Sequence, residues 1–270
     1  MRVAFFAFGG LRLKGLSSGF NTEEYGICGF KSVRNFNEVK ELLYENMVQG
    51  IFIERPNRFI AYVSINGERA VAHVKNTGRC KELLIPGARV ILRAESKEGR
   101  KTPYSLICVY KGDMLINMDS QIPNYVVEEA LGLNKIAGIE AERIKREQRY
   151  GDSRFDVRFR NKLSGKDAFM EVKGVTLEVG GIAKFPDAPT ARGAKHINHL
   201  IKAAGEGYEA YIFFLVQIGG LKIFTPNKET DPVFAESLRA AYESGVKLLC
   251  YNSNIAEDSI TINEPMEIIL

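Results

Sequence analysis

The sequence lacks several features that point directly to well-known classes of protein. It has no tryptophan, three histidines and four cysteines in 270 residues, and the cysteines form no C-x-x-C pair. This argues against a zinc ribbon and a disulfide framework, and we expect buried free thiols in a reducing compartment. No apolar run approaches the ~20 residues that a helix needs to cross a bilayer, so we expect no membrane association.

The start of the chain imitates a secretory signal without completing one. The apolar residues 3–8 are followed by Arg12 and Lys14, and no convincing small-residue cleavage site comes after them. We therefore expect a cytoplasmic protein. The sequence also contains no G-x-G-x-x-G or Walker-type phosphate loop, so an enzyme of sugar or nucleotide metabolism is the weakest of the functional hypotheses.

Charge is present but unevenly distributed. Residues 49–113 hold 12 basic against 6 acidic side chains, residues 138–200 hold 13 against 9, and residues 205–270 hold 4 against 10. A basic surface attracts polyanions, and nucleic acid is the commonest polyanion of a cytoplasm. On charge alone, nucleic-acid binding and an unevenly charged solvated surface stay equally open.

Turn signals and strand patterns divide the chain into three parts. The glycine-rich start is followed by a helix expected at 36–46, and then by about five short strands between residues 51 and 112. Asn66-Gly67 is a strong hairpin signal within them. Short strands at this density predict a small β-barrel.

The pattern changes at Pro123. Strands now alternate with helices, which we expect at 123–131, 190–204 and 232–244, and this predicts a mixed sheet flanked by helices. The predicted organisation is an extension at residues 1–46, a barrel at 47–118 and an α/β (α+β) domain at 119–270.

Two neighbouring strand patterns bring acidic residues together. Residues 153–160 alternate strictly, so Phe155, Val157 and Phe159 should face a core and leave Asp156 on the other side. Glu171 and Lys173 share one face of the next strand, and the intervening Ser164-Gly165 predicts a hairpin. If the two core faces coincide, Asp156, Glu171 and Lys173 converge on one side of the sheet.

This grouping has a chemical meaning. Two carboxylates at short range repel each other unless a cation lies between them, and Mg²⁺ or Mn²⁺ prefers such hard oxygen ligands. The metal polarises a phosphoryl oxygen and lowers the pKa of a bound water, while Lys173 stabilises the negative charge that develops on phosphorus. The plain alternative is a cross-strand salt bridge, because E-x-K is common by itself.

The expected helix at 190–204 adds positive charge beside this strand. Thr190 is a good N-cap, and Arg192, Lys195, His199 and Lys202 form a basic stripe at spacings of 3, 4 and 3 residues. Its N-terminus favours anions through free N–H groups, so the stripe indicates either an external anion or a solvated basic face.

Several motifs resemble the sugar fermentation stimulation protein A (SfsA) family. The resemblance covers residues 47–270 and leaves residues 1–46 outside it. The matching stretches are 54–59, 73–79, 82–87, 153–156, 171–177 and 185–196.

The resemblance implies a fold, a polymer and a site. The fold is an N-terminal OB-fold β-barrel followed by a PD-(D/E)xK restriction-endonuclease-like mixed sheet flanked by helices, and the partner is DNA. Asp156, Glu171 and Lys173 would occupy the nuclease motif. In the nuclease hypothesis, Asp156 and Glu171 hold Mg²⁺ or Mn²⁺, and Asp187 adds a ligand to this catalytic set. The family is also linked to regulation of sugar use, maltose in particular, in enteric bacteria.

Binding residues are expected in both halves of the chain. For Arg58 and Arg79, a role in fixing turns or in the contact between the domains is an equal alternative to phosphate binding. For Phe59 and Tyr62, core packing is favoured over base stacking. The predicted nucleic-acid-binding residues are Arg55, Arg58, Arg79, Arg192, Lys195 and His196.

The sequence leaves two functional hypotheses open. The first is a metal-dependent nuclease that hydrolyses phosphodiester bonds, with DNA as the expected polymer and RNA left open. The second is a non-specific DNA-binding regulatory protein of sugar metabolism, whose nuclease-like site serves binding and not cleavage, because a fold does not imply a function.

Overall fold

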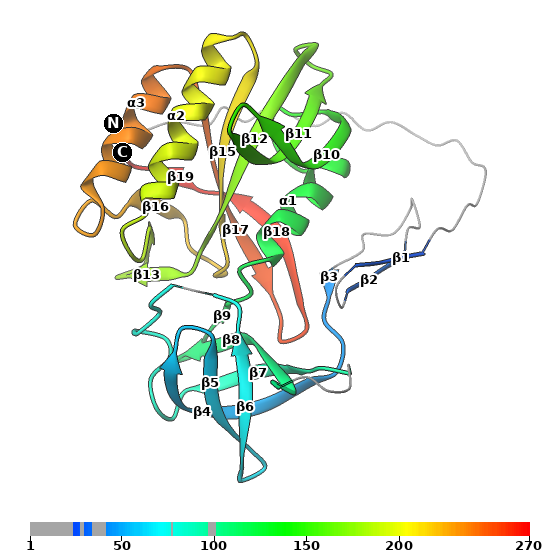
Figure 1. The fold of residues 1–270 in the computed structure, drawn as a ribbon, viewed down its shortest axis with the longest axis vertical. Coiled ribbons are helices and arrows are strands. Elements are labelled where there is room, and N and C mark those ends of the chain that lie inside the picture. The colour runs from blue at the N-terminus through cyan, green and yellow to red at the C-terminus, as the bar shows by residue number, and fades with distance from the viewer. Residues whose placement is uncertain (1–23, 28–29, 34–41, 77, 97–100) are drawn as a thin grey trace.

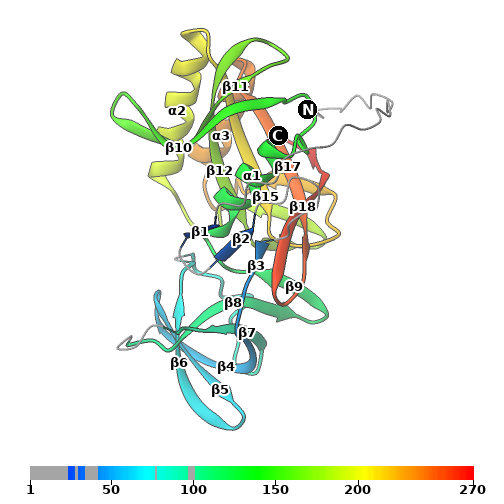
Figure 2. The ribbon, with the colours of Figure 1, turned by 90° about the vertical axis from the view of Figure 1, so that its right-hand side faces the viewer.

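The computed structural model describes residues 24–27, 30–33, 42–76, 78–96 and 101–270. Figure 1 shows a small barrel below a larger sheet flanked by helices, and Figure 2 shows the same two parts after a 90° turn. This is the mixed α/β fold that the sequence predicts. In the described part of the chain, none of the helices is long and apolar enough to span a membrane.

The barrel is formed by a sheet with the strand order β6-β5-β4-β7-β8-β9. A parallel pairing between β6 and β8 closes five of these strands into a barrel. Asn66 and Gly67 have φ angles of 52° and 87°, and this confirms the predicted hairpin, since a tight turn of this type needs positive φ at both positions. The strands are β4 (Met47–Asn57), β5 (Ile60–Ile65), β6 (Glu68–Val74), β7 (Arg89–Ala94), β8 (Tyr104–Lys111) and β9 (Met114–Asn117).

The main sheet has the strand order β10-β11-β12-β15-β17-β18-β3. Its central strand β15 is buried from its second residue to its last, because it has parallel neighbours on both sides and helices over both faces. The strands are β3 (Leu42–Leu43), β10 (Ala141–Tyr150), β11 (Ser153–Asn161), β12 (Lys166–Val175), β15 (Glu209–Val216), β17 (Lys247–Ile255) and β18 (Ser259–Pro265).

Helices and a second sheet complete the larger part. The α2 and α3 helices pack on one face of the main sheet and α1 on the other (Figure 1). The helices are α1 (Ile122–Gly132), α2 (Ala191–Gly205) and α3 (Pro232–Glu243). The second sheet comprises β13 (Leu177–Val179), β14 (Ile182–Phe185), β16 (Ile223–Pro226) and β19 (Glu267–Ile268), and β1 (Glu24–Ile27) pairs with β2 (Phe30–Val33).

The predicted alternation in β11 holds only in part. Phe155, Val157 and Phe159 are all buried, but they belong to two different apolar clusters. Phe155 packs on the α2 side, with its ring centroid 5.3 Å from that of Phe169, whereas Val157 and Phe159 pack on the α1 side. The change of face coincides with the end of the β11–β12 ladder at Val157 and Met170.

Residues 42–46 do not continue the helix predicted for 36–46. Leu42 and Leu43 pair with β18 instead and extend the main sheet, while residues 36–41 lie outside the described residues. Tyr44 then turns inward and is 3% exposed, and its hydroxyl accepts a hydrogen bond from Asn117 Nδ2 at 3.1 Å. Pairing with a free sheet edge has overridden local helix propensity, which is a weak preference.

Tyr44 should contribute strongly to stability, although it lies outside the predicted family region. We expect Tyr44→Ala to lower the free energy of unfolding by about 3 kcal/mol, because it leaves a cavity between the barrel and the main sheet. Urea denaturation measures this, and Leu43→Ala is the control, since Leu43 is 48% exposed. Equal, small effects of both substitutions would show that this segment is not integral to the fold.

Candidate active site

The candidate site lies where β11 and β12 separate. Their ladder ends at the pair Val157 and Met170, so the N–H of Val172 has no backbone partner on β11. Asp156 takes this place, since its Oδ2 accepts a hydrogen bond from Val172 N at 2.8 Å. Asn124 of α1 donates from Nδ2 to the other oxygen, Oδ1, at 3.0 Å. The carboxylate is thereby fixed beside Glu171.

Glu171 is a buried acid between two basic side chains. It is 2% exposed, and its Oε1 accepts a hydrogen bond from Lys173 Nζ at 2.6 Å. The same oxygen contacts His196 Nδ1 on α2. Its second oxygen, Oε2, is buried without a hydrogen-bond partner. A buried carboxylate oxygen without a partner is costly, so this atom is the one suited to bind a cation.

The contacts of His196 define its proton arrangement. Arg192 Nε carries a hydrogen and lies 3.4 Å from His196 Nε2, so Nε2 is the acceptor and Nδ1 donates to Glu171. His196 is 7% exposed. The geometry therefore favours a role in orienting Glu171 over the predicted contact with nucleic acid, and Arg192 is the exposed member of this chain of contacts.

The two acids have opposite pKa shifts. Burial raises the pKa of Asp156, and the negative charge of Glu171 raises it further. Burial also raises the pKa of Glu171, but the hydrogen bond from His196 and the Lys173 ammonium outweigh it, so the net shift is downward. Like-charge repulsion between close carboxylates is the situation that a bound cation relieves.

The residues present fit a divalent cation. Asp156 and Glu171 supply hard carboxylate oxygens, and Glu171 Oε2 has no other partner. In the described ranges, no group of three or more His, Cys, Asp or Glu side chains forms a metal centre. A cation bound by two carboxylates would thus keep several positions for water, as Mg²⁺ commonly does.

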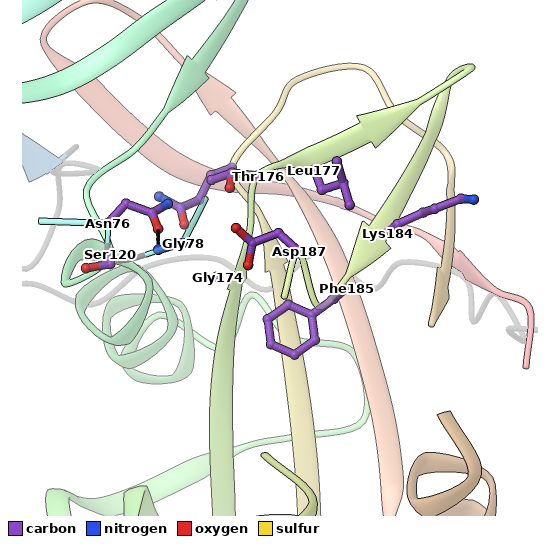
Figure 3. A pocket seen from close by; sticks show the side chains of 10 residues that line it. Asn76, Gly78, Ser120, Gly174, Thr176, Leu177, Lys184, Phe185 and Asp187 are labelled. Atoms are coloured by element: carbon purple, nitrogen blue, oxygen red, sulfur yellow. Dashed lines mark hydrogen bonds between the residues drawn. The ribbon is translucent and has the colours of Figure 1, made fainter. Parts of the chain in front are cut away.

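Asp187 lies at the junction between the barrel and the main sheet. Its Oδ2 accepts a hydrogen bond from Arg79 N at 2.9 Å, and a Cβ on Gly78 would lie 2.2 Å from the same oxygen. Figure 3 shows Asp187 pointing into a polar pocket of about 180 Å³ that Gly174 also lines. Among the described residues, the hydrogen bond of Asp187 is with the barrel residue Arg79, and none joins it to Asp156 or Glu171.

The predicted phosphate-binding arginines of the barrel have different roles. The Arg55 guanidinium donates to the backbone oxygens of Arg58, Asn76, Gly78 and Arg79 at 2.7–3.0 Å, so it organises two loops and has little capacity left for phosphate. Arg58 and Arg79 are exposed. They remain candidates for contact with a phosphate backbone.

The basic stripe of α2 is partly neutralised. Lys195 Nζ lies 3.0 Å from Asp152 Oδ2, and His199 Nε2 lies 3.3 Å from Asp152 Oδ1. The predicted Thr190 cap is confirmed, since its side chain accepts a hydrogen bond from Gly193 N. Arg192 at the start of the helix thus remains the basic residue of α2 that adjoins the acid pair.

Fold and site together define a class of protein in which a closed five-stranded barrel is joined to a mixed sheet flanked by helices that carries a buried acid pair. Residues 53–118 match the SfsA N-terminal OB domain, and residues 121–259 match the sugar fermentation stimulation protein RE domain. The chain belongs to the sugar fermentation stimulation protein (SfsA) family, as its motifs predict.

Relatives in bacteria and archaea agree with this assignment. A sugar fermentation stimulation protein homolog of Clostridium botulinum is 53% identical over 225 residues, which are 83% of this chain and 97% of the relative. The homolog of Clostridium tetani is 50% identical and covers 85% of this chain and 100% of the relative. The solved structure of Pyrococcus furiosus SfsA is 30% identical, covers 86% of this chain and 100% of that one, and has a TM-score of 0.76.

Proposed function

We propose that this protein is a metal-dependent nuclease that hydrolyses phosphodiester bonds in nucleic acid, with DNA as the expected substrate. The observation that carries the proposal is the environment of Glu171. A carboxylate is buried beside a second acid, Asp156, and a lysine, and one of its oxygens has no partner. A structural salt bridge with Lys173 would need only one acid, so it does not explain why two acids lie together here.

Asp156 and Glu171 would hold Mg²⁺ or Mn²⁺, in the manner of PD-(D/E)xK nucleases. When bound, such a metal ion lowers the pKa of a coordinated water and stabilises charge on a phosphoryl oxygen. The Pyrococcus furiosus relative was solved in complex with Ca²⁺, a hard cation that also prefers oxygen ligands, and this supports a cation-binding family member.

The side chains around the acid pair have separate tasks. Asn124 and the N–H of Val172 hold Asp156 in place, and His196 holds Glu171. Lys173 has an ammonium group at hydrogen-bond distance from Glu171, from which it can turn to negative charge developing on phosphorus. Arg192, exposed at the start of α2, would contact a neighbouring phosphate.

One observation favours a second function, DNA binding without cleavage. Lys173 and His196 both contact Glu171 Oε1, so the charge of this carboxylate is already compensated within the protein. In this alternative the same residues would stabilise the fold, and the exposed arginines would bind DNA as part of a regulatory protein. Such binding would fall steeply with salt and vary little with sequence.

Cleavage assays on the full chain separate these functions. Labelled single-stranded DNA, duplex DNA and RNA would be incubated with Mg²⁺, Mn²⁺ or EDTA. We expect cleavage that needs metal and that Glu171→Ala reduces by more than about 10²-fold, with binding retained. The matched control is Glu243→Ala, which removes an exposed acid at the end of α3.

The possible outcomes distinguish the two proposals. Metal-dependent cleavage that survives Glu171→Ala and Asp156→Ala would show that the assigned site is wrong. No cleavage of any substrate, together with salt-sensitive binding by the wild type, would favour the DNA-binding protein.

A further inference from the structure

An exposed aromatic ring lies on the barrel where core packing is predicted. Phe59 is 43% exposed and lies in the turn between β4 and β5. Large apolar side chains on a surface are ordinary when they are isolated, so exposure alone carries little weight. The surroundings of this ring distinguish it.

The turn that carries Phe59 is held by several hydrogen bonds. Asn57 Oδ1 accepts from the N–H groups of Phe59 and Ile60 at 2.9 and 3.1 Å, and Phe59 O accepts from Val74 N at 2.8 Å. The Arg55 guanidinium joins the carbonyl of Arg58 to the carbonyls of Asn76, Gly78 and Arg79. The ring is therefore presented by a fixed backbone, which lowers the entropy cost of binding against it.

A cation accompanies the ring. The guanidinium of Arg58 lies 4.7 Å from the centre of the Phe59 ring. Among the described residues, Arg58 has no carboxylate partner, unlike Arg69, which covers Tyr62 at 4.0 Å but is paired with Glu54 at 2.7 Å. Arg58 thus places an uncompensated positive charge over one face of the exposed Phe59 ring, and a base would stack on the other face.

From this pair we infer that the barrel binds single-stranded nucleic acid, with one unpaired base stacked on Phe59 and Arg58 at the adjoining phosphate. Base–aromatic stacking needs a base whose face is free, which a duplex does not offer. The inference deepens the proposed function and rests on it, because it names the form of substrate for the same protein.

The position of the turn connects this platform to the candidate active site. Arg55 ties the loop that holds Asn76, Gly78 and Arg79 to the turn, and Arg79 N of this loop donates a hydrogen bond to Asp187. Asn76 and Gly78 of this loop line the junction pocket with Gly174, which directly follows Lys173 (Figure 3). A single strand on Phe59 would therefore run past this pocket toward Lys173.

Binding measurements in EDTA test the inference on the full chain. Fluorescence anisotropy would compare a labelled oligo(dT) single strand with a blunt duplex of equal length. We expect Phe59→Ala to weaken single-strand binding by about tenfold or more and to change duplex binding by less than about twofold. Phe59→Tyr should retain wild-type binding, and the control Leu163→Ala, at a side chain 64% exposed, should change neither.

The results overturn the inference in two cases. Either Phe59→Ala leaves single-strand binding unchanged, or it weakens both polymers equally. These measurements contain no metal and involve no turnover. If the wild type never cleaves nucleic acid but Phe59→Ala weakens single-strand binding, only the nuclease proposal is contradicted. A wild type that cleaves while Phe59→Ala binds single strands normally contradicts this inference alone.

Discussion

Replacing Lys173 by methionine should lower the free energy of unfolding by about 3 kcal/mol at neutral pH, because it leaves Glu171 as a buried charge with less compensation. The Lys173 and Glu171 side chains are 17% and 3% exposed, so solvent screens the pair weakly. His196 remains in contact with the carboxylate, which places the expected loss at the lower end for a broken buried pair.

The pH dependence of this loss follows from the pKa of Glu171. In the wild type this pKa is lowered, so the ionised carboxylate contributes stability above its ordinary pKa, and the contribution is lost as the pH falls. Without Lys173, only His196 opposes the effect of burial, so the pKa of Glu171 should be higher in the variant than in the wild type, and protonation relieves the variant in acid. Urea unfolding should therefore show that the difference in free energy of unfolding between wild type and Lys173→Met is smaller at about pH 4 than at pH 7.

The control for this prediction is a lysine in an exposed ion pair. Lys195→Met breaks an exposed ion pair with Asp152 and should leave stability unchanged at either pH. Lys173→Met should also abolish cleavage while nucleic-acid binding persists. A Lys173→Met protein as stable as the wild type at neutral pH would mean that His196 alone compensates Glu171.

Much of the acid site was predictable from strand alternation. The spacing of Asp156, Glu171 and Lys173 on two strands joined by a hairpin brings them together because the strands are neighbours. The same reasoning could not find Asn124, which reaches Asp156 from α1 on another element. Nor could it show that β11 changes face at Asp156, since this depends on where the ladder ends.

The tertiary arrangement also reassigned several basic residues. Arg55 and His196 carry charge or donors in the sequence, and both are predicted to contact nucleic acid. In the fold, the Arg55 guanidinium is surrounded by loop carbonyls. His196 instead contacts Glu171. Exposure reversed the expectation for Phe59 as well, because a turn residue next to a strand has no fixed alternation to follow.

Asp156→Asn should stabilise the metal-free protein by about 1 kcal/mol at neutral pH while abolishing metal-dependent cleavage. The pKa of Asp156 is raised by burial and by Glu171, so the folded state binds a proton here more tightly than the unfolded state. At neutral pH the ionised form therefore costs stability, and the cost vanishes as the pH falls below the ordinary carboxyl pKa. Asparagine removes this cost and can still accept from Val172 N, and Asn124 can turn its amide to match.

Bound metal should make the wild type more stable than Asp156→Asn, which is the reverse of the order expected without metal. A ligand that binds only the folded state stabilises it by about 2.7 kcal/mol at 100 times its Kd, and the wild type should gain this in Mn²⁺ while Asp156→Asn does not. Thermal unfolding in EDTA and in a Mn²⁺ series would show the variant melting higher without metal and lower with it. Equal stabilisation of both proteins by Mn²⁺ would place the metal elsewhere. This crossover of the two melting temperatures is expected if the acid pair binds a cation and destabilises the fold when no metal is bound. A purely structural salt bridge would give no metal-dependent change.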